Sequence, residues 1–174
     1  MIESEFPRPV RLDAIGQAPH ALHLTAEPAE REALAKRFDL VTLDRLEVEA
    51  AVRREAATVF AEGRISADVV QSCVATGQPI PATVHEPFSL RFVPETAIGD
   101  ADEVELSDGD CDTLSYAGSA IDLGEAAAET LLLALDPFPR CADADDTLRA
   151  AGLVDESDVG PFAALKALRD KLGG

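Results

Sequence analysis

A short acidic segment holds the densest group of possible ligand side chains in this sequence. Asp108, Asp110 and Asp112 stand at alternate positions, and carboxylates in that arrangement supply oxygen ligands in calcium-binding loops. Such a loop needs a glycine at its sixth position and a bidentate glutamate at its twelfth, where this chain has Thr113 and Ser119. The segment is therefore interpreted as a solvated acidic loop that binds cations weakly and without selectivity.

The other polar groups lack a catalytic arrangement. His20, His23 and His85 do not have the spacing of metal ligands on a helix, and side chains three positions apart on a strand point to opposite faces. Asp122 and Glu125 resemble an acid–base pair, but their spacing is typical of a capped helix start. The chain has no Gly-x-Ser-x-Gly elbow, phosphate-binding loop or dinucleotide fingerprint. The sequence therefore predicts no catalytic residue, no metal ligand and no cofactor.

Three cysteines, Cys73, Cys111 and Cys141, are few, odd in number and far apart. A disulfide framework would instead need an even set of cysteines in a small secreted domain. The first residues show no basic region leading into an apolar stretch, and no apolar run reaches the length of a membrane span. These features predict a cytoplasmic protein.

The formal net charge of −18 is concentrated in the second half of the chain. Residues 1–94 hold 14 acidic and 10 basic side chains, whereas residues 95–174 hold 19 acidic and 5 basic ones. Binding along a nucleic-acid backbone requires Lys and Arg side chains that displace counterions, so a basic protein is favoured over RNA as the partner. An arginine strip on a sheet stays open as an alternative RNA-binding surface. It would consist of Arg45, Arg53, Arg54, Arg64 and Arg91.

The segment 119–141 predicts a helix with a defined start and end. Asp122 stands at the N-cap position, and Glu125 is spaced to bond the free backbone N–H of the cap. Pro137 disfavours helical geometry at the residue before it and therefore ends the helix.

This helix is apolar nearly all round. Leu131 shares one side with Leu123, whereas Leu132 falls on the opposite side. Such a helix is either sandwiched inside the fold or presents a second face to a partner. Phe138, held between two prolines, is either presented to a partner or packed over the helix end.

Alternating apolar and polar residues predict a β sheet in the first half. The clearest strand covers residues 43–55. Residues 57–61 continue or restart it, Glu62–Gly63 is predicted to form a hairpin turn, and residues 65–73 form the next strand. Another turn follows at 76–79.

Further elements lie on either side of these strands. Residues 8–15 and 21–26 read as short strands, and residues 28–38 as a helix with proline in its first turn. Residues 84–92 form a last long strand, where Pro87 indicates a sheet edge or a bulge.

Strands joined by tight turns predict an α+β fold, namely an antiparallel β meander, open or barrel-like, with packed helices. Residues 1–142 would form this domain, with an acidic, turn-rich loop over residues 95–112. Residues 143–174 would be an acidic linker and a carboxy-terminal amphipathic helix, marked by Phe162 and Leu165, that packs on or near the domain.

Several short motifs follow one another along the chain. They are Cys73–Ile80, Glu86–Phe88, Phe92–Glu95, Ile121–Glu125, Glu129–Leu135, Pro137–Pro139 and Pro161–Lys166. In order and spacing they resemble the bacterial DUF177 family, the family of the large ribosomal RNA subunit accumulation protein. The resemblance implies a role in the accumulation or processing of large-subunit (23S) ribosomal RNA.

Many members of that family carry Cys-x-x-Cys near the first of these motifs and further cysteines near the end, a pattern of zinc ligands. Cys73 and Cys141 occupy matching positions here. Thr76 stands where a second thiolate is needed, and no cysteine follows Cys141. The resemblance therefore implies buried or idle thiols in this chain rather than a bound zinc.

These observations predict a non-catalytic ribosome biogenesis factor that acts on ribosomal RNA through a basic ribosomal protein or rRNA-processing factor. The alternatives are a metal-dependent or hydrolytic enzyme of nucleic-acid metabolism and a protein that binds ribosomal RNA directly. The residues predicted to contact the partner are Asp102, Glu103, Glu105, Asp108, Asp110, Asp112, Leu132 and Phe138.

Overall fold

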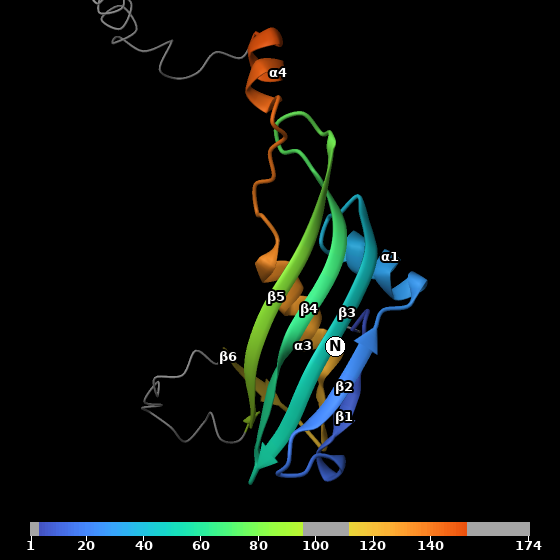
Figure 1. The fold of residues 1–174 in the computed structure, drawn as a ribbon, viewed down its shortest axis with the longest axis vertical. Coiled ribbons are helices and arrows are strands. Elements are labelled where there is room, and N and C mark those ends of the chain that lie inside the picture. Colours follow the sequence, from blue (N-terminus) through green and yellow to red (C-terminus); the bar gives the residue numbers. More distant parts are fainter. Residues whose placement is uncertain (1–3, 96–111, 153–174) are drawn as a thin grey trace, which may run out of the picture. The chain divides into compact units, whose positions relative to one another are not determined.

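Two long paired strands, β3 (Thr42–Glu55) and β4 (Thr58–Ser72), form the centre of the main sheet. The computed structural model describes residues 4–95 and 112–152. Figure 1 shows the five-stranded order β2-β3-β4-β5-β6, in which β2, β5 and β6 comprise His20–Thr25, Pro79–Pro94 and Asp112–Tyr116. β2, β3 and β4 pair antiparallel, whereas β5 and β6 are parallel.

The sheet and its helices confirm the predicted α+β class. Within the described residues the main sheet ends at β2 and β6, so it is open and does not close into a barrel. Pro87 lies in the part of β5 that precedes its pairing with β6, which begins at Leu90. At such an edge position proline, which has no backbone N–H, removes no hydrogen bond between strands.

The turn between β3 and β4 lies earlier than the sequence predicted. Ala56 and Ala57 form it, and Ala56 adopts a φ of 53°. Glu62–Gly63 instead lies inside β4, so the predicted turn was wrong. A Cβ atom at Gly63 would lie 2.0 Å from the carbonyl oxygen of Glu49. Glycine is present there because the backbone of β3 passes close by. Close approach of another backbone is a common reason for a glycine inside a strand.

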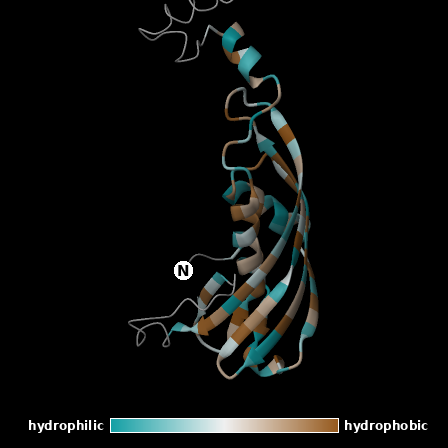
Figure 2. Cartoon of the chain, turned by 60° about the vertical axis from the view of Figure 1, so that its left-hand side comes forward, coloured by the Kyte–Doolittle hydropathy of each residue, from teal (hydrophilic) through white to brown (hydrophobic). Residues whose placement is uncertain are grey.

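One face of the main sheet is covered by α1 (Pro28–Arg37) and α3 (Leu123–Ala134), as Figure 1 shows. The predicted alternation of β3 holds, because Leu46, Val48 and Val52 are fully buried. Figure 2 shows apolar and polar residues alternating along the strands. The sheet therefore has one face in the core and one polar face.

The start of α3 agrees with the sequence in part. Asp122 caps it, because its Oδ1 accepts the backbone N–H of Glu125 at 3.1 Å. The Glu125 carboxylate does not complete a capping box and instead binds the guanidinium of Arg37 on α1 at 2.7 Å. A reciprocal capping box does occur at α1, between Glu27 and Glu30.

A second, two-stranded antiparallel sheet pairs β1 (Pro9–Arg11) with β7 (Ala120–Asp122). The strand predicted over residues 8–15 is shorter than expected, because a 3₁₀ turn, Leu12–Ala14, follows β1 directly. β7 runs straight into α3, so β1 lies at the point where that helix begins.

The residues before β1 hold the start of α3. Phe6 is fully buried, and the backbone N–H of Arg8 donates to Asp122 Oδ1 at 2.9 Å. The Arg8 guanidinium pairs with Glu30 of α1 at 2.7 Å. A Cβ atom at Gly124 would lie 2.0 Å from the carbonyl oxygen of Phe6, so this close approach requires glycine in the first turn of α3.

The chain divides into two compact units, one of Met1–Gln71 with Pro81–Pro137 and the other of Ser72–Ile80 with Phe138–Gly174. The second unit contains α4 (Ala144–Ala150), a short helix in the stretch predicted as a linker. The predicted amphipathic helix that contains Phe162 lies outside the described residues, as do residues 96–111 of the predicted acidic loop. Among the helices that are described, none has the length and apolarity to cross a membrane.

Candidate functional site

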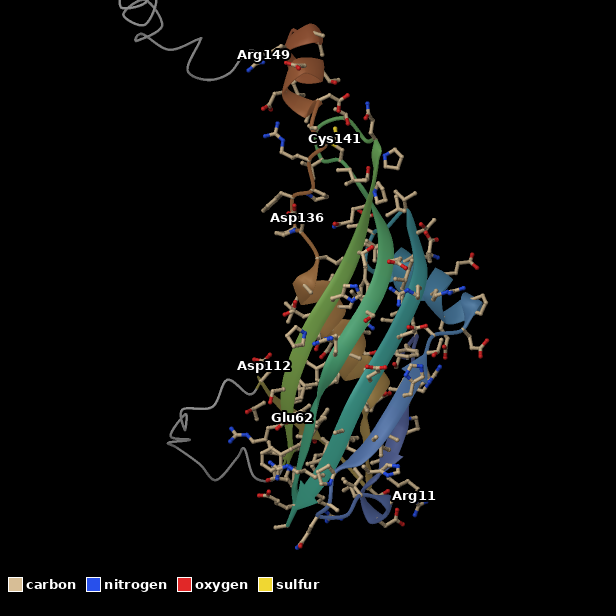
Figure 3. The ribbon with its side chains drawn as sticks, viewed as in Figure 1. Arg11, Glu62, Asp112, Asp136, Cys141 and Arg149 are labelled. Atoms are coloured by element: carbon tan, nitrogen blue, oxygen red, sulfur yellow. The ribbon has the colours of Figure 1, made fainter. Side chains whose placement is uncertain are left out.

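Of the six acidic residues predicted to bind a partner, the structure describes Asp112. It is exposed at the start of β6, opposite Leu90 of β5 (Figure 3). The others lie outside the described residues, so their role in binding stays a prediction. They are Asp102, Glu103, Glu105, Asp108 and Asp110.

The two predicted apolar contact residues are both exposed. On α3, Leu131 is fully buried, whereas Leu132 is 44% exposed and Leu133 is 82% exposed. Leu131 and Leu132 therefore face different environments, as their positions on the helix predicted. Phe138, in the second unit, is 73% exposed.

The outer face of the main sheet carries arginines of the alternative RNA-binding strip, but these side chains already bind carboxylates. Arg45 pairs with Asp68 at 2.8 Å and with Glu47 at 3.1 Å. Arg53 pairs with Glu55. A phosphate backbone would have to compete with these ion pairs.

Two more arginines of that strip bond to oxygen atoms of the same chain. Arg54 donates to the carbonyl oxygen of Leu12 at 2.9 Å, and Arg91 donates to the hydroxyl of Thr113 at 2.9 Å. Arg64 has no bonding partner among the residues that the structure describes. The strip therefore offers few uncommitted positive charges.

An acidic cleft of about 430 Å³ opens in the first unit between α3 and the end of the main sheet. Phe92 of β5 and Tyr116 of β6 form part of its wall. Asp122, Glu125 and Glu129 bring three carboxylates to it, and the described residues that line it include no basic side chain. Carboxylates gathered in one cleft suit the cationic side chain of Lys or Arg.

The three carboxylates differ in the hydrogen bonds and ion pairs that they already make with described residues. Asp122 accepts two backbone N–H groups. The Arg37 guanidinium bound to Glu125 holds the pKa of that carboxyl below its usual range, against the opposing effect of burial. Glu129 is exposed and has no bonding partner within the described part of the chain. Glu129 is therefore the carboxylate most available to a ligand.

Cys73 and Cys141, which lie far apart in the sequence, meet in the second unit beside the turn that joins β4 to β5. Their Sγ atoms are 3.1 Å apart, and the backbone N–H of Cys141 donates to Cys73 Sγ at 3.3 Å. The Thr76 hydroxyl lies 3.2 Å from Cys141 Sγ. We call these three residues the thiol cluster. Figure 3 labels Cys141, on the segment that follows α3.

Backbone hydrogen bonds hold the two segments that carry the thiol cluster. The turn is closed by Cys73 N–H to the Gln78 carbonyl oxygen and by Gly77 N–H to the Cys73 carbonyl oxygen, both at 2.8 Å. Gly77 has a φ of 74°, a conformation that glycine adopts without strain. Val74 N–H then donates to the Pro139 carbonyl oxygen at 2.9 Å, which fixes the second segment against the turn.

These contacts give the two thiols different acidities. The backbone N–H of Cys141 and, next, the Thr76 hydroxyl stabilise the Cys73 thiolate, so the pKa of Cys73 is lowered to about 6. The hydrogen bond with Thr76 lowers the pKa of Cys141, but the bond to Cys73 and burial outweigh it, and the net change is upward. These contacts therefore favour a thiolate at Cys73 and a thiol at Cys141.

The histidines do not assemble a site. His23 and His20 lie on β2, whereas His85 lies on β5, with β3 and β4 between them. His85 bonds the Ser66 hydroxyl at 3.1 Å. Within residues 4–95 and 112–152, no three side chains of the His, Cys, Asp or Glu types lie together as a metal site would require.

Sequence reasoning missed both the cleft and the meeting of the two thiols. The cleft combines β5, β6 and α3, and no local pattern indicates which acidic residues those elements bring together. For the thiol cluster there was a signal, because Cys73, Thr76 and Cys141 stand at the positions where the resemblance implied a group of cysteines.

Comparison with known proteins gives one family. Residues 61–169 match the family described as large ribosomal RNA subunit accumulation protein YceD. No curated protein and no solved structure matches the chain. The matched residues include most of β4, the thiol cluster, the acidic cleft and α3. The chain therefore belongs to the large ribosomal RNA subunit accumulation protein family.

Proposed function

We propose that this protein is a non-catalytic factor of ribosome biogenesis that binds a basic ribosomal protein or rRNA-processing factor through the acidic cleft. By holding that partner it supports the accumulation or processing of 23S ribosomal RNA, the role for which the family is named. The cytoplasm, where ribosomes are assembled, is the compartment we propose. The observation that carries the proposal is the cleft itself, with three carboxylates, two aromatic rings and no basic side chain among its described lining residues.

The edge of the cleft continues into an exposed apolar surface on the same helix. Glu129 lies three and four positions before Leu132 and Leu133, so the three side chains are neighbours on the surface of α3. Leu132 and Leu133 are exposed. A partner segment with a Lys or Arg next to apolar residues would match both the carboxylate and the leucines.

Electrostatics favour a protein partner over direct contact with RNA. The chain has a formal charge of −18, which repels polyanions. The arginines that could form a local basic strip are mostly bound to carboxylates, carbonyl groups or a hydroxyl of the same chain. We therefore propose that RNA is affected through the bound protein.

A tagged Glu129→Lys variant tests the cleft as the binding site. Reversing this charge should prevent capture of the basic partner from cell extract, because a second positive charge would face the incoming side chain. Glu62→Lys is the matched control, since Glu62 is an exposed glutamate of β4 outside the cleft (Figure 3). This control should capture the partner as the wild type does.

Ribonuclease treatment during the same capture separates a protein partner from an RNA tether. We expect the ribosomal or processing protein to stay bound after RNA is digested, and to be lost only with Glu129→Lys. Loss of the partner on digestion, with no effect of Glu129→Lys, would instead assign RNA as the ligand and would contradict the proposal.

The cellular role is tested separately by deleting the gene. The ratio of large-subunit to small-subunit ribosomal RNA should fall, and a plasmid carrying the wild-type gene should restore it. An unchanged ratio during both rich and cold growth would contradict the proposed role. Rescue by Glu62→Lys but not by Glu129→Lys would connect that role to the cleft.

A further inference from the structure

The thiol cluster places two sulfur atoms of unequal exposure in direct contact. Cys73 is buried, with 2% of its surface exposed, whereas Cys141 is partly exposed. Their Sγ atoms are 3.1 Å apart, about 1 Å more than the S–S bond of a disulfide. Neither sulfur belongs to the acidic cleft, so the proposed partner binding does not account for them.

Backbone hydrogen bonds hold the segments that carry the two cysteines next to each other. Val74, next to Cys73, donates to the carbonyl oxygen of Pro139, two residues before Cys141. The Cys141 N–H also points at Cys73 Sγ. A further approach of ~1 Å would bring the two sulfurs to disulfide bonding distance.

From this geometry we infer that Cys73 and Cys141 are a modification site, at which a hydroperoxide oxidises the two thiols to a reversible intramolecular disulfide. The partly exposed Cys141 sulfur meets the oxidant, and the buried Cys73 sulfur resolves the product. Hydrogen peroxide is the simplest oxidant of this class.

The steps balance with one molecule of peroxide. Cys141 passes its proton to the Cys73 thiolate across the hydrogen bond that joins them, and the Cys141 thiolate then attacks one peroxide oxygen. The O–O bond breaks, Cys141 becomes a sulfenic acid, and the leaving hydroxide takes the proton from Cys73 and departs as water. The Cys73 thiolate next attacks the Cys141 sulfur. The S–O bond breaks, and hydroxide takes a proton from solvent and leaves as a second water.

The low pKa of Cys73 fits its role as the resolving thiol. Resolution requires a thiolate at Cys73 at neutral pH, and its pKa is lowered to about 6. A low-molecular-weight thiol reverses the reaction by exchange at the more exposed Cys141 sulfur. Oxidation would thus covalently join the β4–β5 turn to the segment that carries Cys141, and reduction would release it.

The experiment uses the full-length reduced protein, treated with hydrogen peroxide and then with catalase. Remaining thiols are labelled with a maleimide in denaturant, and disulfide-linked peptides are identified by mass spectrometry without reduction. Of the three cysteines, two should be lost, the peptides containing Cys73 and Cys141 should be linked, and Cys111 should be labelled. Dithiothreitol should restore all three thiols.

Single serine variants separate this route from unrelated oxidation. Cys111→Ser should form the same disulfide as the wild type. Cys73→Ser should form no intramolecular disulfide. Retention of three thiols in the oxidised wild type, or linkage of Cys111 to Cys73 or Cys141, would overturn the inference, and both results are read from the wild-type protein.

Discussion

Thr76 takes the position of a zinc-ligating cysteine in the implied family pattern, and its hydroxyl has a different effect on the sulfurs beside it. It lies 3.2 Å from Cys141 Sγ and contributes to the low pKa of Cys73. A hydroxyl stabilises a thiolate without binding a metal. After the backbone N–H of Cys141, Thr76 therefore makes the next contribution to the lowered pKa of Cys73.

The acidity of Cys73 can be measured in the Cys111→Ser protein from the ultraviolet absorbance of the thiolate. We expect a first ionisation at about pH 6, well below the value of roughly 8.5 for a free cysteine. Thr76→Val should move it upward, because one donor to the thiolate is lost. Since the folded pKa is below the unfolded one, the thiolate contributes stability above the unfolded pKa, and this contribution is lost as the pH falls through about 6. A first ionisation near 8.5 in both proteins would contradict the assignment.

Gly63 shows how one residue type misled the sequence analysis. Its missing side chain makes room for the backbone of β3 and for the ring of Phe88 on β5, because a Cβ atom would lie 2.0 Å from the Glu49 carbonyl oxygen and 2.9 Å from Phe88 Cζ. Gly63→Ala should lower the free energy of unfolding by about 2 kcal/mol or more, because neither backbone can move easily. Gly16→Ala is the control, as nothing lies within 4 Å of a Cβ atom there. Chemical denaturation of both variants measures the difference, and equal stabilities would show that the sheet adapts.

Among the elements, α3 contributes both to the core and to the proposed binding surface. Leu131→Ala should lower the free energy of unfolding by about 2 to 5 kcal/mol, because Leu131 is fully buried. Leu132→Ala should change it by about 0.5 kcal/mol and should weaken capture of the partner instead. Thermal denaturation and capture from extract test the two effects. Large destabilisation by both substitutions would remove Leu132 from the binding surface.

The elements that the sequence predicted are those with strong local signals. The alternation of Leu46, Val48 and Val52 specifies the buried face of β3, and Asp122 specifies the start of α3. The turn at Ala56 was missed because the chain adopts a positive φ there without glycine. Tertiary contacts can also override a local pattern. The Glu125 carboxylate binds Arg37 of α1 and does not bond the free backbone N–H at the start of α3. The candidate site was the least predictable, because it combines elements that are distant in sequence.

The charge of the whole molecule should act mainly on the rate of binding. Replacing Asp108, Asp110 and Asp112 with asparagine should slow association with the captured basic partner and reduce its dependence on salt, because fewer carboxylates attract that partner. Stability should be nearly unchanged. Neutralising three exposed acids of the other half should affect association less; the control set is Asp44, Glu49 and Glu62. Stopped-flow measurements at several salt concentrations test this prediction. Equal association rates in the two triple variants would show that the position of the acidic residues in the chain does not affect binding.

The family match begins at residue 61, inside β4, whereas the fold needs the residues before it. A fragment of residues 61–169 would lack β3 and α1, which supply fully buried Leu46, Val48 and Leu34. It would also leave the long edge of β4 unpaired. We expect this fragment to aggregate or to lack a cooperative unfolding transition, whereas the full chain unfolds cooperatively. A cooperative transition in the fragment would show that the matched residues fold alone.

The bond between Arg8 and Asp122 has a consequence for the order of events during synthesis. It joins positions 114 residues apart, and the buried ring of Phe6 lies in the same amino-terminal segment. Phe6 and Arg8 leave the ribosome before α3 does, so they cannot reach their final contacts until α3 has emerged. Contacts of such long sequence separation slow folding. We therefore expect the nascent chain to stay sensitive to proteases until synthesis has passed this helix.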